Sequence, residues 1–394
     1  MATSSAGASR RPSLVSQLGL LVTAVFINLF SRMVFSPLLP AMERDLGFSH
    51  ARGGSFFFYM AAGYAGSMLL SGFLSKRITH RRTIAVSLST VSLGLLIVAV
   101  APAVTYMPVG LLVIGIGSGL YAPSGITTLT HLVEPDKWGA ATAFHEVGPN
   151  VAFVVAPVFV TLMVGWADWR TALLTTAGAT LVVAISFLLW GKGGRFPGVP
   201  PHLSKIRLLT ANPSYPWVLL FFTAAMAAAI GVYGMLPSYL VAARGMDEAL
   251  ANNVVSLSRV LGIGAIFVSG LLTDRIRAPA LLASAAILAG GATLAIGTLS
   301  GPWLVAAVLI EAPVAAAFIP IMLTVLSRTS SPELRSLAVA VTIPFAYVVG
   351  AGLVPYLIGV IAEHISFSLG FLLVGGAITA LAPAAPWAGR AGGR

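Results

Sequence analysis

Long apolar stretches separated by short polar ones run along almost the whole sequence. Each holds about 20 or more mostly apolar residues, the length that a helix needs to cross the hydrocarbon of a bilayer. Strands of a membrane barrel would alternate apolar and polar residues over about ten positions, and no segment does so. The pattern predicts an all-α protein with twelve transmembrane spans, at Leu14–Met42, Gly53–Ser75, Thr83–Val104, Met107–Leu132, Trp138–Val164, Thr171–Trp190, Pro216–Ala242, Ala251–Thr273, Ala278–Leu299, Pro302–Leu326, Leu334–Ala362 and Phe367–Ala388.

The composition excludes a soluble enzyme. Of 394 residues, 57% are hydrophobic and 9% are charged, whereas a soluble domain carries about 25% charged residues. There is no cysteine for a disulfide scaffold or a thiolate metal site, and the six histidines lack metal-ligand spacing. No phosphate-binding loop of the P-loop type is present. We therefore expect neither catalysis nor a cofactor nor a metal.

The basic residues indicate how the chain is oriented. The net charge of +11 does not indicate nucleic acid, because the basic residues lie in the gaps between apolar stretches rather than on one soluble face. With the N-terminus inside, seventeen of the 23 Lys and Arg face the cytoplasm and four face outward. This bias predicts a multi-pass protein of the cytoplasmic (inner) membrane with both termini in the cytoplasm. The first apolar stretch is too long for a signal peptide, so we expect it to be retained.

The chain divides into two similar halves. The longest polar interval, from Gly191 to Tyr215, is rich in Gly, Pro and basic residues. It predicts an N-terminal six-helix bundle at 1–191, a cytoplasmic linker at 192–215 and a C-terminal bundle at 216–394. The motif GFLSKRI at 72–78 recurs as GLLTDRI at 270–276, 198 residues later. Pro123 and Pro135 match Pro320 and Pro332, each 197 residues later. Several matches at one spacing indicate an internal duplication.

These motifs resemble the major facilitator superfamily over essentially the whole chain. The family's loop signature after span two is Gly-x-Leu-Ala-Asp-Arg. The second copy matches its Gly, Leu, Asp and Arg positions, whereas the first copy has Lys76 at the Asp position. The resemblance implies two pseudo-symmetric six-helix bundles that alternate between inward-open and outward-open states. It also implies that these loops act in gating, through Gly72, Arg77, Gly270, Asp274 and Arg275.

Spans four and five depart from the drug:proton antiporters of that family. Span five keeps only the Gly148-Pro149 centre of the antiporter signature. Span four has the glycines of the family pattern, at 115, 117 and 119, but lacks the arginine that proton-coupled drug exporters usually place there. Glycine and proline within a bundle allow close helix approach and bending. Both departures disfavour standard drug:proton antiport.

Four charged residues lie well inside predicted spans: Arg32, Glu146, Arg259 and Glu311. A charge in the bilayer core costs about 2.5–3.5 kcal/mol on insertion scales, so such residues face water or a partner. Our hypothesis is that the two arginines bind an anionic group of the substrate while Glu146 or Glu311 carries a proton, assisted by His145. The alternative is that these charges form static ion pairs between helices.

Other polar and aromatic residues occupy the helices that line the cavity in the family. We select as substrate-binding candidates, besides the two arginines, Tyr59, Tyr121, Asn150, Tyr233, Asn253 and Tyr347; Tyr64, Asn252 and Ser256 belong to the same group. For each of them an interhelical hydrogen bond or an interfacial position is an equally good explanation.

The sequence therefore predicts a secondary transporter that moves a small organic anion. We expect it to be coupled to protons, because titratable carboxylates lie within its spans. We expect it to be a monomer whose partners are the substrate, protons and lipid. One alternative is proton-driven efflux of hydrophobic drugs or metabolites. A second alternative is a membrane sensor that binds a ligand without moving it.

Overall fold

The protein is a bundle of membrane-spanning helices. The computed structural model describes residues 14–198, 206–331 and 333–389, with the backbone alone described for Asp274 and Ser336. Within these residues there are twelve helical spans long and apolar enough to cross a membrane, and no strand. The twelve spans and the all-α fold are confirmed, and each span end lies within a few residues of its predicted position. The chain is a multi-pass membrane protein.

The first six spans lie between Leu14 and Trp190. They are α1 (Leu14–Met33) with α2 (Phe35–Leu46), α3 (His50–Ile78), α4 (His80–Ala99), α5 (Met107–Leu132), α6 (Trp138–Trp166) and α7 (Trp169–Trp190). Short 3-10 turns, η1 (Val104–Tyr106) and η2 (Pro135–Lys137), precede α5 and α6.

The second six spans follow a short helix, α8 (Ile206–Thr210). Span seven consists of α9 (Tyr215–Met226), η4 (Ala227–Val232), α10 (Tyr233–Ser238) and η5 (Tyr239–Ala243), and the next three are α11 (Glu248–Arg275), α12 (Ala278–Thr298) and α13 (Gly301–Thr329). Span eleven is α14 (Arg335–Ala346), η6 (Tyr347–Leu353) and α15 (Val354–His364), and span twelve is α16 (Phe367–Ala380), η7 (Ala382–Ala384) and α17 (Ala385–Ala388). The segments η4, η5 and η6 are π-helical.

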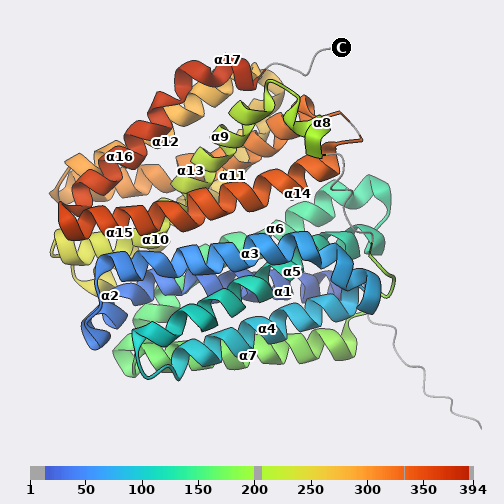
Figure 1. Ribbon diagram of the computed structural model, residues 1–394, viewed down its shortest axis with the longest axis horizontal. Helices are drawn as coiled ribbons and strands as arrows, with labels where there is room; N and C mark the ends of the chain where they lie inside the picture. Colours follow the sequence, from blue (N-terminus) through green and yellow to red (C-terminus); the bar gives the residue numbers. More distant parts are fainter. Residues whose placement is uncertain (1–13, 199–205, 332, 390–394) are drawn as a thin grey trace, which may run out of the picture.

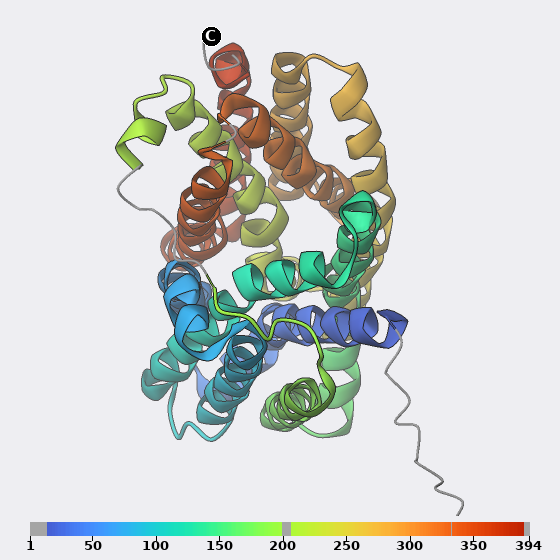
Figure 2. The same ribbon diagram turned by 90° about the vertical axis from the view of Figure 1, so that its right-hand side faces the viewer.

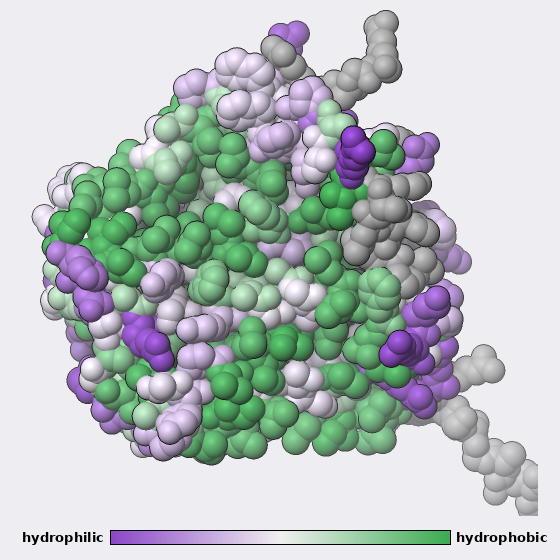
Figure 3. Space-filling view, in the orientation of Figure 1, coloured by the Kyte–Doolittle hydropathy of each residue, from purple (hydrophilic) through white to green (hydrophobic). Residues whose placement is uncertain are grey.

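The two sets of helices lie side by side as two halves. Figures 1 and 2 show α1–α7, in blue to green, below the helices from α9 onward, in yellow-green to red. A broad apolar surface crosses the face seen in Figure 3, and hydrophilic residues gather at its left and right margins. An apolar band between polar ends is what a bilayer requires of a spanning bundle. The division at residues 191 and 216 stays a prediction.

Within the N-terminal half, glycines allow α3, α4 and α5 to approach closely. A Cβ at Gly117 of α5 would lie 2.6 Å from the backbone nitrogen of Val91 in α4. Gly115 and Gly119, two residues before and after Gly117, face α3, where a Cβ would overlap backbone atoms of Met60 and Tyr64. The span-four glycines are therefore sites of close packing on both faces of α5.

The two halves are in tight contact at one end, which we call the far end because it is opposite the end where α7 leads into the segment after Trp190. Arg44 of α2 forms an ion pair of 3.0 Å with Glu248 of α11. A Cβ at Gly54 of α3 would lie 2.5 Å from the carbonyl oxygen of Pro355 in α15. The His50 ring lies 4.6 Å from that of Phe367. The far end is therefore closed by packing between the halves.

Candidate substrate-binding site

The four intramembrane charges differ in exposure. Arg32, Arg259 and Glu311 are buried, at 5%, 6% and 0% exposed. The Glu146 side chain is 53% exposed. Among the described residues, neither arginine forms an ion pair with a carboxylate, and neither does Glu311 with a base. The geometry thus differs from the static ion pairs that were the alternative hypothesis.

Arg32, in the last turn of α1, lies between two tyrosine rings. Its guanidinium carbon lies 4.8 Å from the ring centre of Tyr64 in α3 and 5.4 Å from that of Tyr347 at the start of η6. Arg32 Nη1 donates a hydrogen bond to the Tyr347 hydroxyl. Both distances are within the range of cation–π attraction. Arg32 therefore joins the two halves, while its Nε has no hydrogen-bond partner among the described residues.

Arg259, in α11, has an equivalent environment. Its guanidinium carbon lies 4.7 Å from the ring centre of Tyr233 and 5.3 Å from that of Phe153 in α6. Arg259 Nη1 donates to the carbonyl oxygen of Ala229 at 3.1 Å. That carbonyl lies in the π-helical η4, where the usual hydrogen-bond pattern changes. The Nε and Nη2 atoms of Arg259 have no partner among the described residues.

The two clusters correspond under the internal repeat. Each combines an arginine and a tyrosine from the first two spans of one half with a ring from the fifth span of the other half. In the first cluster the arginine is on span one and the tyrosine on span two, and in the second these positions are exchanged. We call them the Arg32 triad (Arg32, Tyr64, Tyr347) and the Arg259 triad (Arg259, Tyr233, Phe153). Both triads therefore cross the contact between the halves.

Two proline-freed carbonyl groups join span one to span seven. Pro37 has no N–H to donate to the carbonyl of Met33, and that oxygen lies 3.4 Å from the Tyr233 hydroxyl. Pro237 likewise leaves the Tyr233 carbonyl free, and it accepts a hydrogen bond of 2.6 Å from Ser36 Oγ. Because Met33 follows Arg32 and Tyr233 contacts Arg259, these bonds place the two triads next to each other.

Glu311 is buried on α13 without a donor. Neither carboxylate oxygen has a hydrogen-bond partner among the described residues, although Arg259 is near enough to interact with it electrostatically. Burying an ionised carboxylate without hydrogen bonds costs several kcal/mol. Protonation removes that cost, so the position suits a carboxyl group that gains and loses a proton.

Tyr121, His145 and Glu146 form a chain within the N-terminal half. The Tyr121 hydroxyl lies 3.0 Å from His145 Nε2 and 3.1 Å from the carbonyl oxygen of Leu21. His145 Nδ1 lies 3.4 Å from Glu146 Oε1. His145 and Tyr121 are both 2% exposed. The chain thus leads from the buried core to an exposed carboxylate, which also lies within electrostatic reach of Tyr64.

The remaining substrate-binding candidates make no hydrogen bond to either triad. Asn150 donates to the Glu146 carbonyl at 2.8 Å, one turn back along α6. Asn253 is exposed, whereas Asn252 is 1% exposed with both amide atoms unpaired among the described residues. Tyr59 lines a groove of about 580 Å³ between α3 and α15 at the far end.

The gating candidates lie at the ends of α3 and α11. Arg77 and Arg275 are exposed, Gly72 is partly buried and Gly270 is exposed; the Asp274 side chain lies outside the described part. Sequence reasoning left Phe153 out of the site, since only the fold brings its ring to Arg259. Tyr64 and Asn252 were noted but not selected.

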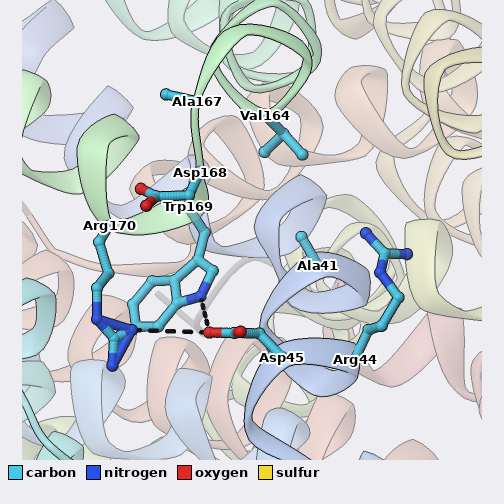
Figure 4. Close-up of a pocket in the computed structure, with 8 residues that line it drawn as sticks. All are labelled: Ala41, Arg44, Asp45, Val164, Ala167, Asp168, Trp169 and Arg170. Carbon is cyan, nitrogen blue, oxygen red and sulfur yellow. Dashed lines mark hydrogen bonds and ion pairs between the residues drawn. The ribbon is translucent and has the colours of Figure 1, made fainter.

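A further pocket, of about 470 Å³, lies at the far end of the N-terminal half (Figure 4). Trp169 Nε1 donates to Asp45 Oδ2 at 2.8 Å, and the Arg170 guanidinium lies over the Trp169 ring at 4.1 Å. Asp168 caps α7 by accepting from the Thr171 backbone N–H at 2.7 Å, and this bond holds the pKa of Asp168 below its usual value. The Trp-Arg pair thus anchors α7 to α2.

Comparison with known proteins identifies the family. The family model described as Major Facilitator Superfamily matches residues 21–343. The chain belongs to the Major Facilitator Superfamily. It is a transporter of this superfamily and not an enzyme, as the sequence predicted.

Two superfamily relatives differ in what their names say they carry. "Probable sulfoacetate transporter SauU" of Cupriavidus necator is 22% identical over 282 residues, which cover 66% of this chain and 64% of that protein. A chloramphenicol efflux pump of Mycobacterium tuberculosis is 26% identical over 334 residues, which cover 71% of this chain and 80% of the pump. The first match thus spans less than two thirds of that relative's length.

Solved structures of superfamily transporters share the fold. A bacterial homologue of the human lysosomal transporter Spinster, in an inward-facing and occupied conformation, matches with a TM-score of 0.82 at 14% identity, covering 96% of this chain and 97% of that one. A D-xylose–proton symporter matches with a TM-score of 0.76 at 14% identity, covering 95% and 97%.

Proposed function

We propose that this transporter is a secondary active carrier that moves a small organic anion across the cytoplasmic membrane together with, or in exchange for, protons. The observation that carries the proposal is the pair of buried arginines, which have unpaired nitrogens and no carboxylate partner among the described residues. A buried guanidinium nitrogen that lacks an acceptor is costly, and an anionic group on the substrate supplies that acceptor. The transporter named for sulfoacetate adds support.

The contacts between the halves support alternating access. The halves pack tightly at the far end, and we assign the opposite end, with both termini and the linker, to the cytoplasm because basic residues gather there. In this assignment the protein is closed to the outside, and transport requires the far-end contacts to break while others form. We propose that it works as a monomer in which 192–215 link the bundles 1–191 and 216–394.

The proton is proposed to bind at Glu311 or at Glu146. Glu311 supports the first choice through its buried, donor-free position. The chain from Tyr121 through His145 supports the second, because it connects the core to an exposed carboxylate.

Transport by purified protein in liposomes tests the proposal. A pH gradient should drive uptake of small carboxylates or sulfonates, followed by an internal pH-sensitive dye. Arg259→Gln should lower anion flux and Glu146→Gln or Glu311→Gln should change its pH dependence. Intact flux with unchanged pH dependence in all three variants would refute the proposal. Binding without flux would indicate a sensor.

A second candidate is proton-driven efflux of hydrophobic drugs or metabolites. It is favoured by the likeness to the chloramphenicol pump and by the aromatic rings of both triads. The same liposomes decide between the two, because neutral drugs would then be moved by the proton gradient while small anions would not.

A further inference from the structure

The two buried arginines lie one on each half of the protein, and both keep unpaired hydrogen-bond donors. Arg32 presents an unpaired Nε, and Arg259 presents an unpaired Nε and Nη2. Each guanidinium is held against two rings, which fix its plane without using its remaining hydrogen-bond donors. Both side chains are more than nine-tenths buried, so solvent supplies little of the missing hydrogen bonding.

The triads are near neighbours because Tyr233 of the Arg259 triad lies against the backbone of the residue that follows Arg32. Its ring lies 4.7 Å from the Arg259 guanidinium carbon, and its hydroxyl lies 3.4 Å from the carbonyl oxygen of Met33, the residue after Arg32. The Met33 carbonyl and the Tyr233 ring thus bring both arginines to one contact between span one and span seven.

Charge balance then indicates what the molecule must carry. The acidic residue that interacts with Arg259 is Glu311, which makes no ion pair with it and has no donor among the described residues. Glu146 is half-exposed and pairs with neither arginine, so when Glu311 is protonated no buried carboxylate of the described residues compensates the two arginines. A monoanion leaves one of them buried and unpaired, whereas a dianion compensates both.

From this arrangement we infer that the substrate carries two anionic groups on a short spacer, one bound by Arg32 and the other by Arg259, so that it bridges the two halves. This inference rests on the proposed function, since it specifies the class of anion at the same site. A bridging dianion contacts both halves at once, and its binding therefore depends on how the halves are arranged. Each end group is a carboxylate or a sulfonate, because each of these groups offers two oxygen atoms that can accept side by side from two N–H groups of a guanidinium.

Binding of matched diacids and half-amides tests the inference. The probes are succinate and sulfoacetate, compared with succinamate, which keeps the size of succinate and loses one charge. Affinity is measured by titration calorimetry on the purified full-length protein in detergent. The diacids should bind at least about tenfold more tightly than succinamate, because succinamate compensates one guanidinium alone.

Variants show whether the two arginines share the dianion. Arg32→Gln and Arg259→Gln should each reduce succinate affinity to near that of succinamate. They should lower succinamate affinity by only about two- to threefold, because a monoanion retains one of two comparable sites. Arg32→Lys and Arg259→Lys keep the charge and should recover part of the succinate affinity. Thermal unfolding of the ligand-free variants identifies any variant that does not fold.

The outcomes separate this inference from the proposed function. Equal affinity of the wild-type protein for succinate and succinamate would overturn the inference that the substrate is a dianion, while anion transport would remain in place. This comparison needs no variant. If only one of the two arginine-to-glutamine variants lost affinity for succinate, the inference that the substrate bridges both arginines would be overturned. Binding of neutral or cationic compounds with no anion binding at all would overturn the proposed function itself.

Discussion

The packing of Gly54 against α15 makes the closure of the far end testable. In Gly54→Ala the new Cβ would lie 2.5 Å from the Pro355 carbonyl oxygen and 2.9 Å from Tyr356 Cα, both backbone atoms of the other half. Backbone atoms cannot rotate away as a flexible side chain can, and overpacking of this kind costs about 1–3 kcal/mol. The clash exists only when the far end is closed. We therefore expect the ratio of closed to open molecules to fall by about 5- to 150-fold.

The control variant must create a clash as severe as that of Gly54→Ala, but within one half of the protein. Gly117→Ala serves, since its Cβ would lie 2.6 Å from Val91 N, a contact between α5 and α4 within the N-terminal half. That clash is present in both states, so it should lower the melting temperature without shifting the conformational equilibrium.

Spin labels measure the equilibrium directly. The chain has no cysteine, so labels at Thr105→Cys in η1 and at Ser300→Cys just before α13, both exposed positions, give a signal without background. Double electron–electron resonance should show a longer-distance population in Gly54→Ala that is absent from Gly117→Ala. The reasoning is refuted if Gly54→Ala keeps the wild-type distance distribution, or if both variants change it equally.

Three further predictions concern single side chains. Glu311→Gln should abolish coupling of anion flux to a pH gradient while exchange of anion for anion continues. If coupling were retained, the coupling proton would bind at a residue other than Glu311. Tyr347→Phe removes the hydrogen bond to Arg32 and should destabilise the protein by about 1.5–3 kcal/mol in thermal unfolding. Tyr64→Phe should cost less, because the Tyr64 hydroxyl makes no hydrogen bond to a described residue; equal losses would contradict this. Asp168 has a lowered pKa, so its cap stabilises above the unfolded pKa near 3.9 and the stabilisation is lost as the pH falls through the folded value. Asp168→Ala should cost about 0.5–1 kcal/mol at pH 7, discounted for exposure, and progressively less as the pH falls through the folded pKa; a constant cost would count against the cap.

The spans could be predicted from the sequence because the bilayer imposes a length and an apolar composition on every one of them. Span twelve ends where predicted, at Ala388, and span two differs by three residues at each end. The charged residues were also recognisable, since Arg32 and Arg259 interrupt otherwise apolar helices. A charge in hydrocarbon is costly wherever it lies, so these residues can be recognised as unusual without knowledge of the fold.

The partners of those charges could not be predicted. Phe153 has no sequence feature that distinguishes it from other apolar residues of α6, and it reaches Arg259 only because span five of one half crosses span eight of the other. Asn252 and Asn253 are adjacent, and the sequence did not show which faces inward, because one residue turns a helix by about 100°. Glu146 and Glu311 looked alike in the sequence, yet one is half-exposed and the other fully buried.

A structure of the protein determined with succinate bound, by electron cryo-microscopy, tests the central claim most directly. The account predicts one carboxylate within hydrogen-bonding distance of the Arg32 guanidinium and the other at Arg259, with Tyr233 beside the ligand. Density for succinate in the far-end pocket around Asp45 and Trp169 instead, with both arginines paired to carboxylates of the protein, would contradict it.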